Sequence, residues 1–175
     1  MQKAAFLDRD GVINERVAIH DYIRKWEDFR FLGQAAEAIA LLNRSGYLVV
    51  LVSNQRGVAR GLLTMDTVDA IHRNMRAELA RRGARIDGIY VCPHDVGECR
   101  CRKPDIGLFL QAEREFEIDK TASWMVGDEE TDVEAGRNYG VRTILIGERR
   151  QSGCDMLCAN LMEAARYIVS EGRVN

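Results

Sequence analysis

Long apolar runs, proline and an excess of charge of either sign are all scarce in this sequence. No apolar stretch approaches the roughly 20 residues that a membrane-spanning helix needs, so we expect no membrane segment. The first residues enter an apolar run without the pattern of a signal peptide, which favours a cytoplasmic protein. Lys and Arg number 25 against 27 Asp and Glu, for a formal net charge of -2. This balance argues against a general nucleic-acid binder.

Cysteine is also sparse, but three of the five cysteines lie close together between Cys92 and Cys101. An odd, clustered set favours a metal site in a reducing compartment over a framework of disulfides. The apolar content of 46% and the charged content of 30% are typical of a soluble globular protein. We therefore expect residues 1–175 to form a single domain with its own core, and to act as a monomer.

Apolar runs of strand length alternate with segments of helical periodicity along the whole chain. The predicted strands are 4–7, 47–52, 89–92, 123–126 and 143–146, and the predicted helices are 33–45, 64–82, one opened and capped by Asp105, a short one after 132, and one from about 157 to 169. This alternation predicts an α/β fold with a doubly wound, Rossmann-like parallel sheet and helices on both faces. The intervals between motifs leave no room for a separate cap domain, and we expect residues 14–31 to form a flap over the site.

Polar residues follow four of the predicted strands at the point where each strand ends. They are Asp8 and Asp10 with Gly11, then Ser53 and Asn54, then Lys103, and finally Asp128. Ligands bind outside the carboxyl ends of the strands in sheets of this type, close to the point where strand order reverses. The sequence therefore predicts that these four segments converge on one cleft.

The converging residues have the chemistry of a phosphoryl-transfer site. Asp8, Asp10 and Asp128 offer oxygen ligands suited to Mg2+, while Ser53 and Lys103 can hold phosphoryl oxygens. One carboxylate of the Asp-x-Asp pair would attack phosphorus to form an aspartyl-phosphate, and the other would serve as acid and base. The residues alone do not order these two roles.

Three other interpretations of the aspartates fit less well. An EF-hand loop needs its glycine at the sixth position, but here Gly11 follows the second aspartate directly. No Gly-x4-Gly-Lys-Ser/Thr motif is present, which argues against a P-loop. A phosphoaccepting signalling receiver would carry its accepting aspartate after a middle strand, and the order of motifs here differs.

A second metal site is indicated by a Cys-x-His-x4-Cys-x-Cys array. Its ligands would be Cys92, His94, Cys99 and Cys101, on a small loop inserted at 92–101 after the third strand. Three thiolates and one imidazole complete a tetrahedral set for Zn2+ and leave no open position, so the zinc would be structural. It would fix the loop that leads into Lys103. Cys154 and Cys158 read as ordinary thiols, and His20 and His72 as surface or packing residues.

Four ordered motifs resemble those of haloacid dehalogenase superfamily phosphatases. They are Asp8-Arg9-Asp10-Gly11-Val12-Ile13-Asn14, Ser53-Asn54-Gln55, Cys101-Arg102-Lys103-Pro104 and Gly127-Asp128. With the cysteine-rich loop, the resemblance is closest to zinc-containing D-glycero-D-manno-heptose 1,7-bisphosphate 7-phosphatases and the related histidinol-phosphate phosphatases.

This resemblance implies specific roles for the motif residues. Asp8 would be the nucleophile and Asp10 the acid/base, and Mg2+ would be held by the Asp8 side chain, the Asp10 backbone carbonyl and Asp128. It further implies that Ser53, Asn54 and Lys103 surround the phosphate. Arg102 resembles a residue that meets the far end of the substrate.

The substrate remains open between several classes. A small phosphorylated sugar, heptose bisphosphate, is favoured, and histidinol phosphate is the alternative, with Glu15 or Asp21 available to meet an amine. A nucleic-acid 3′-phosphatase would need a basic groove, and a non-catalytic zinc-stabilised binding or signalling domain would be expected to have lost one of the motif residues. The short link at 95–98 and Arg56, where a small residue is common, could both reshape substrate selection.

Overall fold

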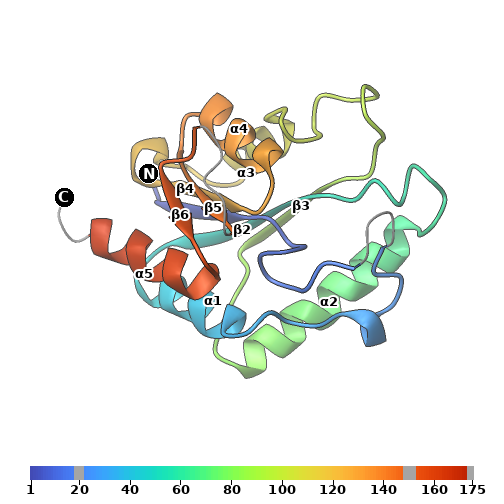
Figure 1. Ribbon diagram of the computed structural model, residues 1–175, viewed down its shortest axis with the longest axis horizontal. Coiled ribbons are helices and arrows are strands. Elements are labelled where there is room, and N and C mark those ends of the chain that lie inside the picture. The colour runs from blue at the N-terminus through green and yellow to red at the C-terminus, as the bar shows by residue number, and fades with distance from the viewer. Residues whose placement is uncertain (18–21, 148–152, 173–175) are drawn as a thin grey trace.

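The fold is built around one parallel sheet of six strands. The computed structural model describes residues 1–17, 22–147 and 153–172 (Figure 1). Its strands are β1 (Ala4–Leu7), β2 (Leu48–Asn54), β3 (Gly88–Cys92), β4 (Trp124–Gly127), β5 (Arg142–Ile146) and β6 (Met156–Cys158). They lie in the order β3-β2-β1-β4-β5-β6, and each neighbouring pair is parallel. The strand order therefore reverses between β1 and β4, as in a doubly wound fold.

Helices cover both faces of this sheet, as predicted. Figure 1 shows one layer on either side, and the two buried clusters of apolar side chains assign the helices to them. One layer holds α1 (Ala35–Arg44), α2 (Met65–Arg81) and α5 (Leu161–Glu171), and the other holds α3 (Gly107–Glu113) and α4 (Glu130–Tyr139). Two short 3-10 helices, η1 (Trp26–Asp28) and η2 (Lys120–Ala122), lie in the connections. No separate cap domain is evident in the described residues.

The central strand β1 is buried on both faces. Ala5 and Leu7 pack in the cluster beneath α1 and α5, whereas Ala4 and Phe6 pack on the opposite side, and all four are fully buried. The Phe6 ring lies 4.8 Å from that of Phe109 in α3. A short apolar run without alternation is typical of a parallel strand covered in this way. Its carboxyl end therefore opens at the middle of the sheet edge.

The segment between β1 and α1 is held down by aromatic rings. Trp26 stacks on Phe29 at a centroid distance of 5.0 Å, and Phe29 packs edge-on against Phe31 at the same distance. Two backbone hydrogen bonds join the ends of the segment, from the N–H of Glu15 to the carbonyl of Arg30 and from the N–H of Leu32 to the carbonyl of Ile13. These contacts fasten the base of the flap to the fold. His20 and Asp21 lie outside the described residues.

Two local predictions are wrong. Asp105 does not cap α3, because the helix begins at Gly107 with Ile106 in the capping position. The backbone N–H of Asp105 instead donates to the carbonyl of Arg102 in a turn. The closing helix begins only at Leu161, since Met156–Cys158 pairs with β5 as the edge strand β6. An apolar run of three residues is too short to distinguish strand from helix by periodicity.

None of the described helices is long and apolar enough to cross a membrane.

Candidate active site

Lys103 lies at the centre of the candidate site. Its Nζ donates to Asp8 Oδ1 at 2.8 Å, to Asp132 Oδ1 at 2.6 Å and to the carbonyl of Val52 at 2.8 Å. The residue is only 3% exposed, so these three acceptors replace water around the ammonium. Asp8 follows β1 directly, and its backbone N–H donates to Val126 of β4 at 3.0 Å. The predicted convergence of Asp8 and Lys103 is therefore present at the switch point of the sheet.

Burial and charge shift the pKa values of this pair. Burial raises the pKa of Asp8 to about 6, and the attraction of Lys103 offsets only part of that effect. Burial alone would lower the pKa of Lys103, but the carboxylates of Asp132 and Asp8 raise it above the ordinary lysine value. Lys103 therefore stays charged at neutral pH, whereas Asp8 ionises in the range in which enzymes work.

Three carboxylates form a pocket suited to a hard cation. Oxygens of Asp8, Asp128 and Asp132 lie within 4.8 Å of one another. Asp132 is engaged elsewhere, since one oxygen pairs with Lys103 and the other accepts from the backbone N–H groups of Asp128 and Glu129 at 3.2 and 3.1 Å. Asp8 shares only Oδ1 with Lys103, and Asp128 pairs with Arg16, whose side chain is 46% exposed, so these two carboxylates are the better candidates for ligands. A buried carboxylate and a partly buried one with oxygens this close are the donor set that Mg2+ prefers, so the residues fit this ion.

The pKa of Asp128 shows that negative charge is in excess around these three carboxylates. Burial and the nearby charge of Asp8 raise its pKa to about 7, against the opposing effect of Arg16. The turn after β1 also comes very close, because a Cβ placed on Gly11, which has a φ of +85°, would overlap the carboxylate of Asp128. Only glycine combines this conformation with this approach.

Arg16 of the flap pairs with both oxygens of the same carboxylate. Its Nε lies 2.7 Å from Asp128 Oδ2, and its Nη2 lies 2.6 Å from Glu129 Oε1. These contacts tie the flap to the end of β4 and the start of α4.

Asp10 lies beside Asp8 but points into a separate hydrogen-bond network. Both of its oxygens accept from the buried guanidinium of Arg9, at 3.0–3.3 Å. Asn14 Nδ2 donates to Oδ1 at 2.9 Å, and Gln55 Nε2 donates to Oδ2 at 3.0 Å. Burial would raise the pKa of Asp10, but Arg9 and these hydrogen bonds lower it below the ordinary value. Asp10 is thus a firmly held, ionised carboxylate.

The residues after β2 have different environments. Ser53 is buried, and its hydroxyl accepts from Gln55 Nε2 at 3.0 Å. The side-chain amide of Asn54 pairs with the backbone of Lys103, accepting from its N–H at 3.0 Å and donating to its carbonyl at 3.1 Å. Asn54 thereby fixes the main chain on either side of the lysine.

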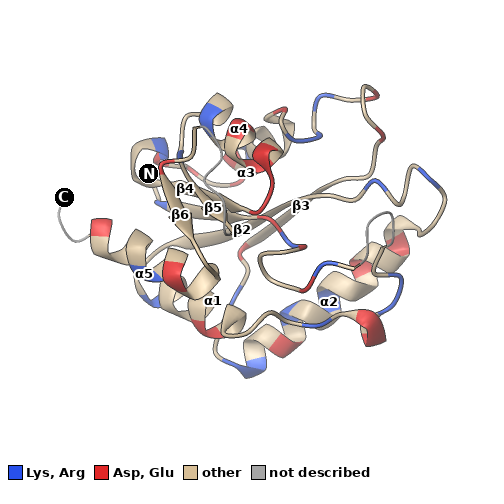
Figure 2. Ribbon diagram, in the orientation of Figure 1, with Lys and Arg blue, Asp and Glu red and all other residues tan. Residues whose placement is uncertain are grey.

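Asp8, Asp10, Asn54 and Lys103 line a cleft of about 650 Å3 that is rich in arginine. Its lining includes Arg16, Arg56, Arg60 and Arg102 together with Asp8 and Lys103. Figure 2 shows basic residues on both loops that follow β2 and β3. Arg56 forms an ion pair with Asp95, which joins these loops. Arg102 has a buried Nη1 without a hydrogen-bond partner among the described residues. A buried donor of this kind needs an acceptor.

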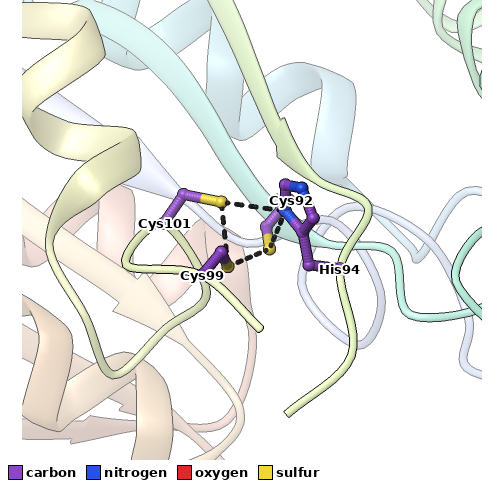
Figure 3. A group of neighbouring side chains, drawn as sticks. All are labelled: Cys92, His94, Cys99 and Cys101. Atoms are coloured by element: carbon purple, nitrogen blue, oxygen red, sulfur yellow. Dashed lines mark hydrogen bonds between the residues drawn. The ribbon is translucent and has the colours of Figure 1, made fainter. Parts of the chain in front are cut away.

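The four predicted zinc ligands come together at the end of β3 and on the loop that follows it. Their side chains point toward one another in Figure 3. Sγ of Cys92 lies 3.5 Å from Sγ of Cys99 and 3.7 Å from Nδ1 of His94, and Sγ of Cys101 lies 3.2 and 3.4 Å from the same two atoms. Zinc bonds of about 2.3 Å to sulfur and about 2.0 Å to nitrogen give tetrahedral edges of roughly 3.5–3.8 Å. The cluster therefore fits one ion.

Known proteins with a similar sequence are phosphatases. A family profile described as HAD-hydrolase-like matches residues 100–170. The D-glycero-beta-D-manno-heptose-1,7-bisphosphate 7-phosphatase of Pasteurella multocida is 43% identical over 154 residues, which cover 83% of this chain and 82% of that protein. The chain belongs to this phosphatase family. The D-glycero-alpha-D-manno-heptose-1,7-bisphosphate 7-phosphatase of Burkholderia mallei is 37% identical to this chain over 179 residues. The aligned region covers 98% of this chain and 90% of the Burkholderia protein.

Solved structures of the phosphatase family have the same fold. The crystal structure of D,D-heptose 1,7-bisphosphate phosphatase from B. bronchiseptica, complexed with magnesium and phosphate, matches with a TM-score of 0.88 at 31% identity. The match covers 97% of this chain and 99% of that one. The predicted superfamily, the doubly wound fold and the phosphatase activity are thereby confirmed.

Several residues of the phosphatase site escaped prediction from sequence. Arg9 lies inside the first motif but had no assigned role, and Arg16 stood in a segment without periodicity. His72 was expected at the surface or in the core packing, yet its ring contacts Arg9. In the structure His72 is buried on α2, and no sequence signal distinguished a packing histidine from one that meets a charged partner.

Proposed function

We propose that this protein is a Mg2+-dependent phosphatase that removes the 7-phosphate of D-glycero-D-manno-heptose 1,7-bisphosphate. The reaction rests on one observation, the meeting of Asp8, Lys103 and Asp128 at the switch point of the sheet. The names of the relatives support the substrate, and so does the arginine-rich cleft, because a bisphosphate brings a second anion. The cationic amine of histidinol phosphate would be repelled by the same arginines.

In the first step, Asp8 would act as the nucleophile. Lys103 holds Asp8 Oδ1, so the other oxygen is free to attack phosphorus while the bond to the sugar oxygen breaks. The electron pair goes to the sugar oxygen, which takes a proton from Asp10. Asp10 is ionised in the free protein, so it would have to bind a proton in the substrate complex, where the negative charge of the phosphate favours the protonated carboxyl. The product is an aspartyl-phosphate on Asp8 and a free sugar hydroxyl.

In the second step, water would attack the phosphorus of this intermediate. Asp10, now ionised, accepts a proton of the water, and the bond between phosphorus and the carboxylate of Asp8 breaks to release phosphate. The hydrogen bonds from Arg9 and Gln55 support the base role, since they favour the ionised form of Asp10. Ser53, Asn54 and Lys103 would surround the phosphoryl group, with Asn54 acting through the backbone of Lys103.

Two metal ions complete the proposed site. Mg2+ would be held by the side chains of Asp8 and Asp128 and the backbone carbonyl of Asp10, where it would neutralise charge on the phosphoryl oxygens. Zn2+ would be held by the three cysteines and the histidine of the loop at 92–101, with a structural role. Because Arg102 and Lys103 directly follow this loop, its order supports both residues. The protein would act as a single-domain monomer.

The test is a comparison of kcat/KM values in the presence of Mg2+. The substrates are both anomers of heptose 1,7-bisphosphate, histidinol phosphate and a 3′-phosphorylated oligonucleotide. We expect one bisphosphate anomer to exceed the other two substrate classes by at least about 10-fold, as one charge-assisted hydrogen bond to a second phosphate would give. Equal, low values for all substrates would rule out heptose 1,7-bisphosphate as the substrate. They would not affect the proposal that the protein hydrolyses phosphomonoesters.

A further inference from the structure

His72 lies beneath the candidate site without lining it. It belongs to α2, between the core residues Val68 and Met75, and only 4% of it is exposed. Its Nε2 lies 3.2 Å from Nη1 of Arg9, which is itself 1% exposed. Arg9 and Asp10 line the cleft, and among the described residues His72 does not. The imidazole therefore meets the site only through Arg9.

The contact with Arg9 fixes the protonation state of the ring. A guanidinium only donates hydrogen bonds and does not lose its proton in proteins. Nε2 of His72 must therefore be the acceptor, which places the ring proton on Nδ1. Nδ1 has no hydrogen-bond partner among the described residues. Burial and the positive charge of Arg9 also lower the pKa of His72 to about 3, which agrees with a neutral ring.

The same guanidinium holds the carboxylate of Asp10. Arg9 Nη2 reaches both oxygens of Asp10, at 3.1 and 3.0 Å, as well as Gln55 Oε1 at 3.3 Å. Its Nη1 faces His72, so the imidazole accepts the hydrogen bond on the side away from Asp10. A buried donor left without an acceptor is costly, and the guanidinium would turn to find another partner. Because the group is rigid and planar, such a turn would move Asp10 too.

We propose that His72 is a positioning residue that, through Arg9, holds the carboxylate of Asp10 in place for proton transfer. The inference rests on the proposed acid/base role of Asp10. In this arrangement the neutral imidazole of His72 orients the guanidinium of Arg9, and the guanidinium orients the carboxylate of Asp10.

The first experiment determines the protonation state and tautomer of the His72 ring. Nitrogen-15 NMR of the full-length protein at pH 7 should show His72 as the neutral tautomer with the proton on Nδ1, assigned by loss of its signals in His72→Gln. The chain has only three histidines, so the assignment is tractable. An imidazolium, or a proton on Nε2, overturns the proposal whatever the enzyme's activity.

The second experiment compares substrates that differ in their leaving groups. The kcat/KM value reports the first phosphoryl transfer, in which a sugar oxygen needs a proton from Asp10 and a p-nitrophenolate does not. His72→Phe keeps a ring but removes the acceptor, and we expect it to lower kcat/KM for the sugar phosphate by about 10-fold or more, since acid catalysis contributes 10²–10⁴-fold. The value for p-nitrophenyl phosphate should fall by less than about 3-fold. His72→Gln, whose Oε1 can accept from Arg9, should restore most of the loss.

Two further variants separate the possible failures. Met75→Leu, a conservative change in the core one turn along α2, should leave both rates near those of the parent. Asp10→Asn should show the same dependence on leaving group as His72→Phe, only stronger. If Asp10→Asn lacks that dependence, the proposed role of Asp10 fails. If Asp10→Asn shows it but His72→Phe behaves like Met75→Leu, the positioning role of His72 is overturned. Should His72→Phe not fold, His72→Asn, too short to reach Arg9, takes its place.

Discussion

Replacing Lys103 with methionine tests how the buried charges of the site balance. Methionine fills a similar volume but leaves Asp8 and Asp132, now 11% and 2% exposed at their side chains, without their shared cation. The carbonyl of Val52 also loses its donor. Breaking a buried ion pair by removing one partner costs about 3–5 kcal/mol. We expect a loss of this size in the free energy of unfolding at pH 8.

The double-mutant cycle with Asp132→Asn isolates the coupling. Each single variant leaves a buried group unpaired, whereas Lys103→Met combined with Asp132→Asn removes one charge of each sign. The double variant should therefore lose less stability than the sum of the singles, by about 1–3 kcal/mol. Both variants that lack Lys103, the single and the double, should be without catalytic activity.

The same variant should respond to pH in a defined direction. The pKa of Asp8 is already raised to about 6 with Lys103 present, and removal of the cation raises it further. A raised carboxyl pKa contributes stability at low pH that is lost as pH rises through the folded-state value. The deficit of Lys103→Met relative to the parent should therefore be small at pH 5 and grow above pH 6.

Urea unfolding in EDTA, followed by the fluorescence of Trp26 and Trp124, measures these free energies. Met75→Leu serves as the control for a conservative change at a buried site. Additive single and double variants, or a deficit that does not change between pH 5 and 8, would refute the assigned charge balance.

Four further outcomes are expected. Asp8→Asn should lower kcat by at least about 10³-fold with an unchanged circular dichroism spectrum; turnover near the parent rate would remove Asp8 as nucleophile. Because the pKa of Asp128 is raised to about 7, a proton must leave before metal binds, so Mg2+ affinity by calorimetry should rise up to about 10-fold per pH unit below 7, and a flat profile would contradict this. A strong chelator should lower the Tm of the parent by about 5 °C or more but leave Cys101→Ser unaffected, and equal sensitivity of both would argue against the zinc site. Arg102→Ala should lower kcat/KM for the bisphosphate by about 10-fold or more and for a monophosphate much less, while equal losses would separate Arg102 from the second phosphate.

Much of the site could be predicted because parallel strands place their carboxyl ends at one edge. Once the apolar runs were assigned as strands, Asp8, Lys103 and Asp128 had to converge, and the spacing of the cysteine-rich loop identified its own cluster. Both predictions depend only on chain order and local spacing. They required no knowledge of how helices pack.

The remaining features depend on packing, which the sequence pattern does not contain. Arg9 and His72 meet because α2 packs on the same face of the sheet as Ala5 and Leu7 of β1. Helix α3 begins at Gly107 and not at the predicted position. The backbone N–H of Gly107 donates to the carbonyl of Arg100, and a Cβ on residue 107 would overlap that carbonyl group. Close backbone contacts of this kind set element boundaries without a local signal.

The central position of β1 also orders events during synthesis of the chain. A nascent protein emerges with its N-terminal part first, and β1 gains its second neighbour only when β4 has been made. The hydrogen bond from the backbone of Ala4 to Ser123 Oγ spans the same interval. The cysteine-rich loop, in contrast, carries its ligands between Cys92 and Cys101 and closes locally. The growing chain can therefore bring these four side chains together before the residues that complete the phosphatase site have left the ribosome.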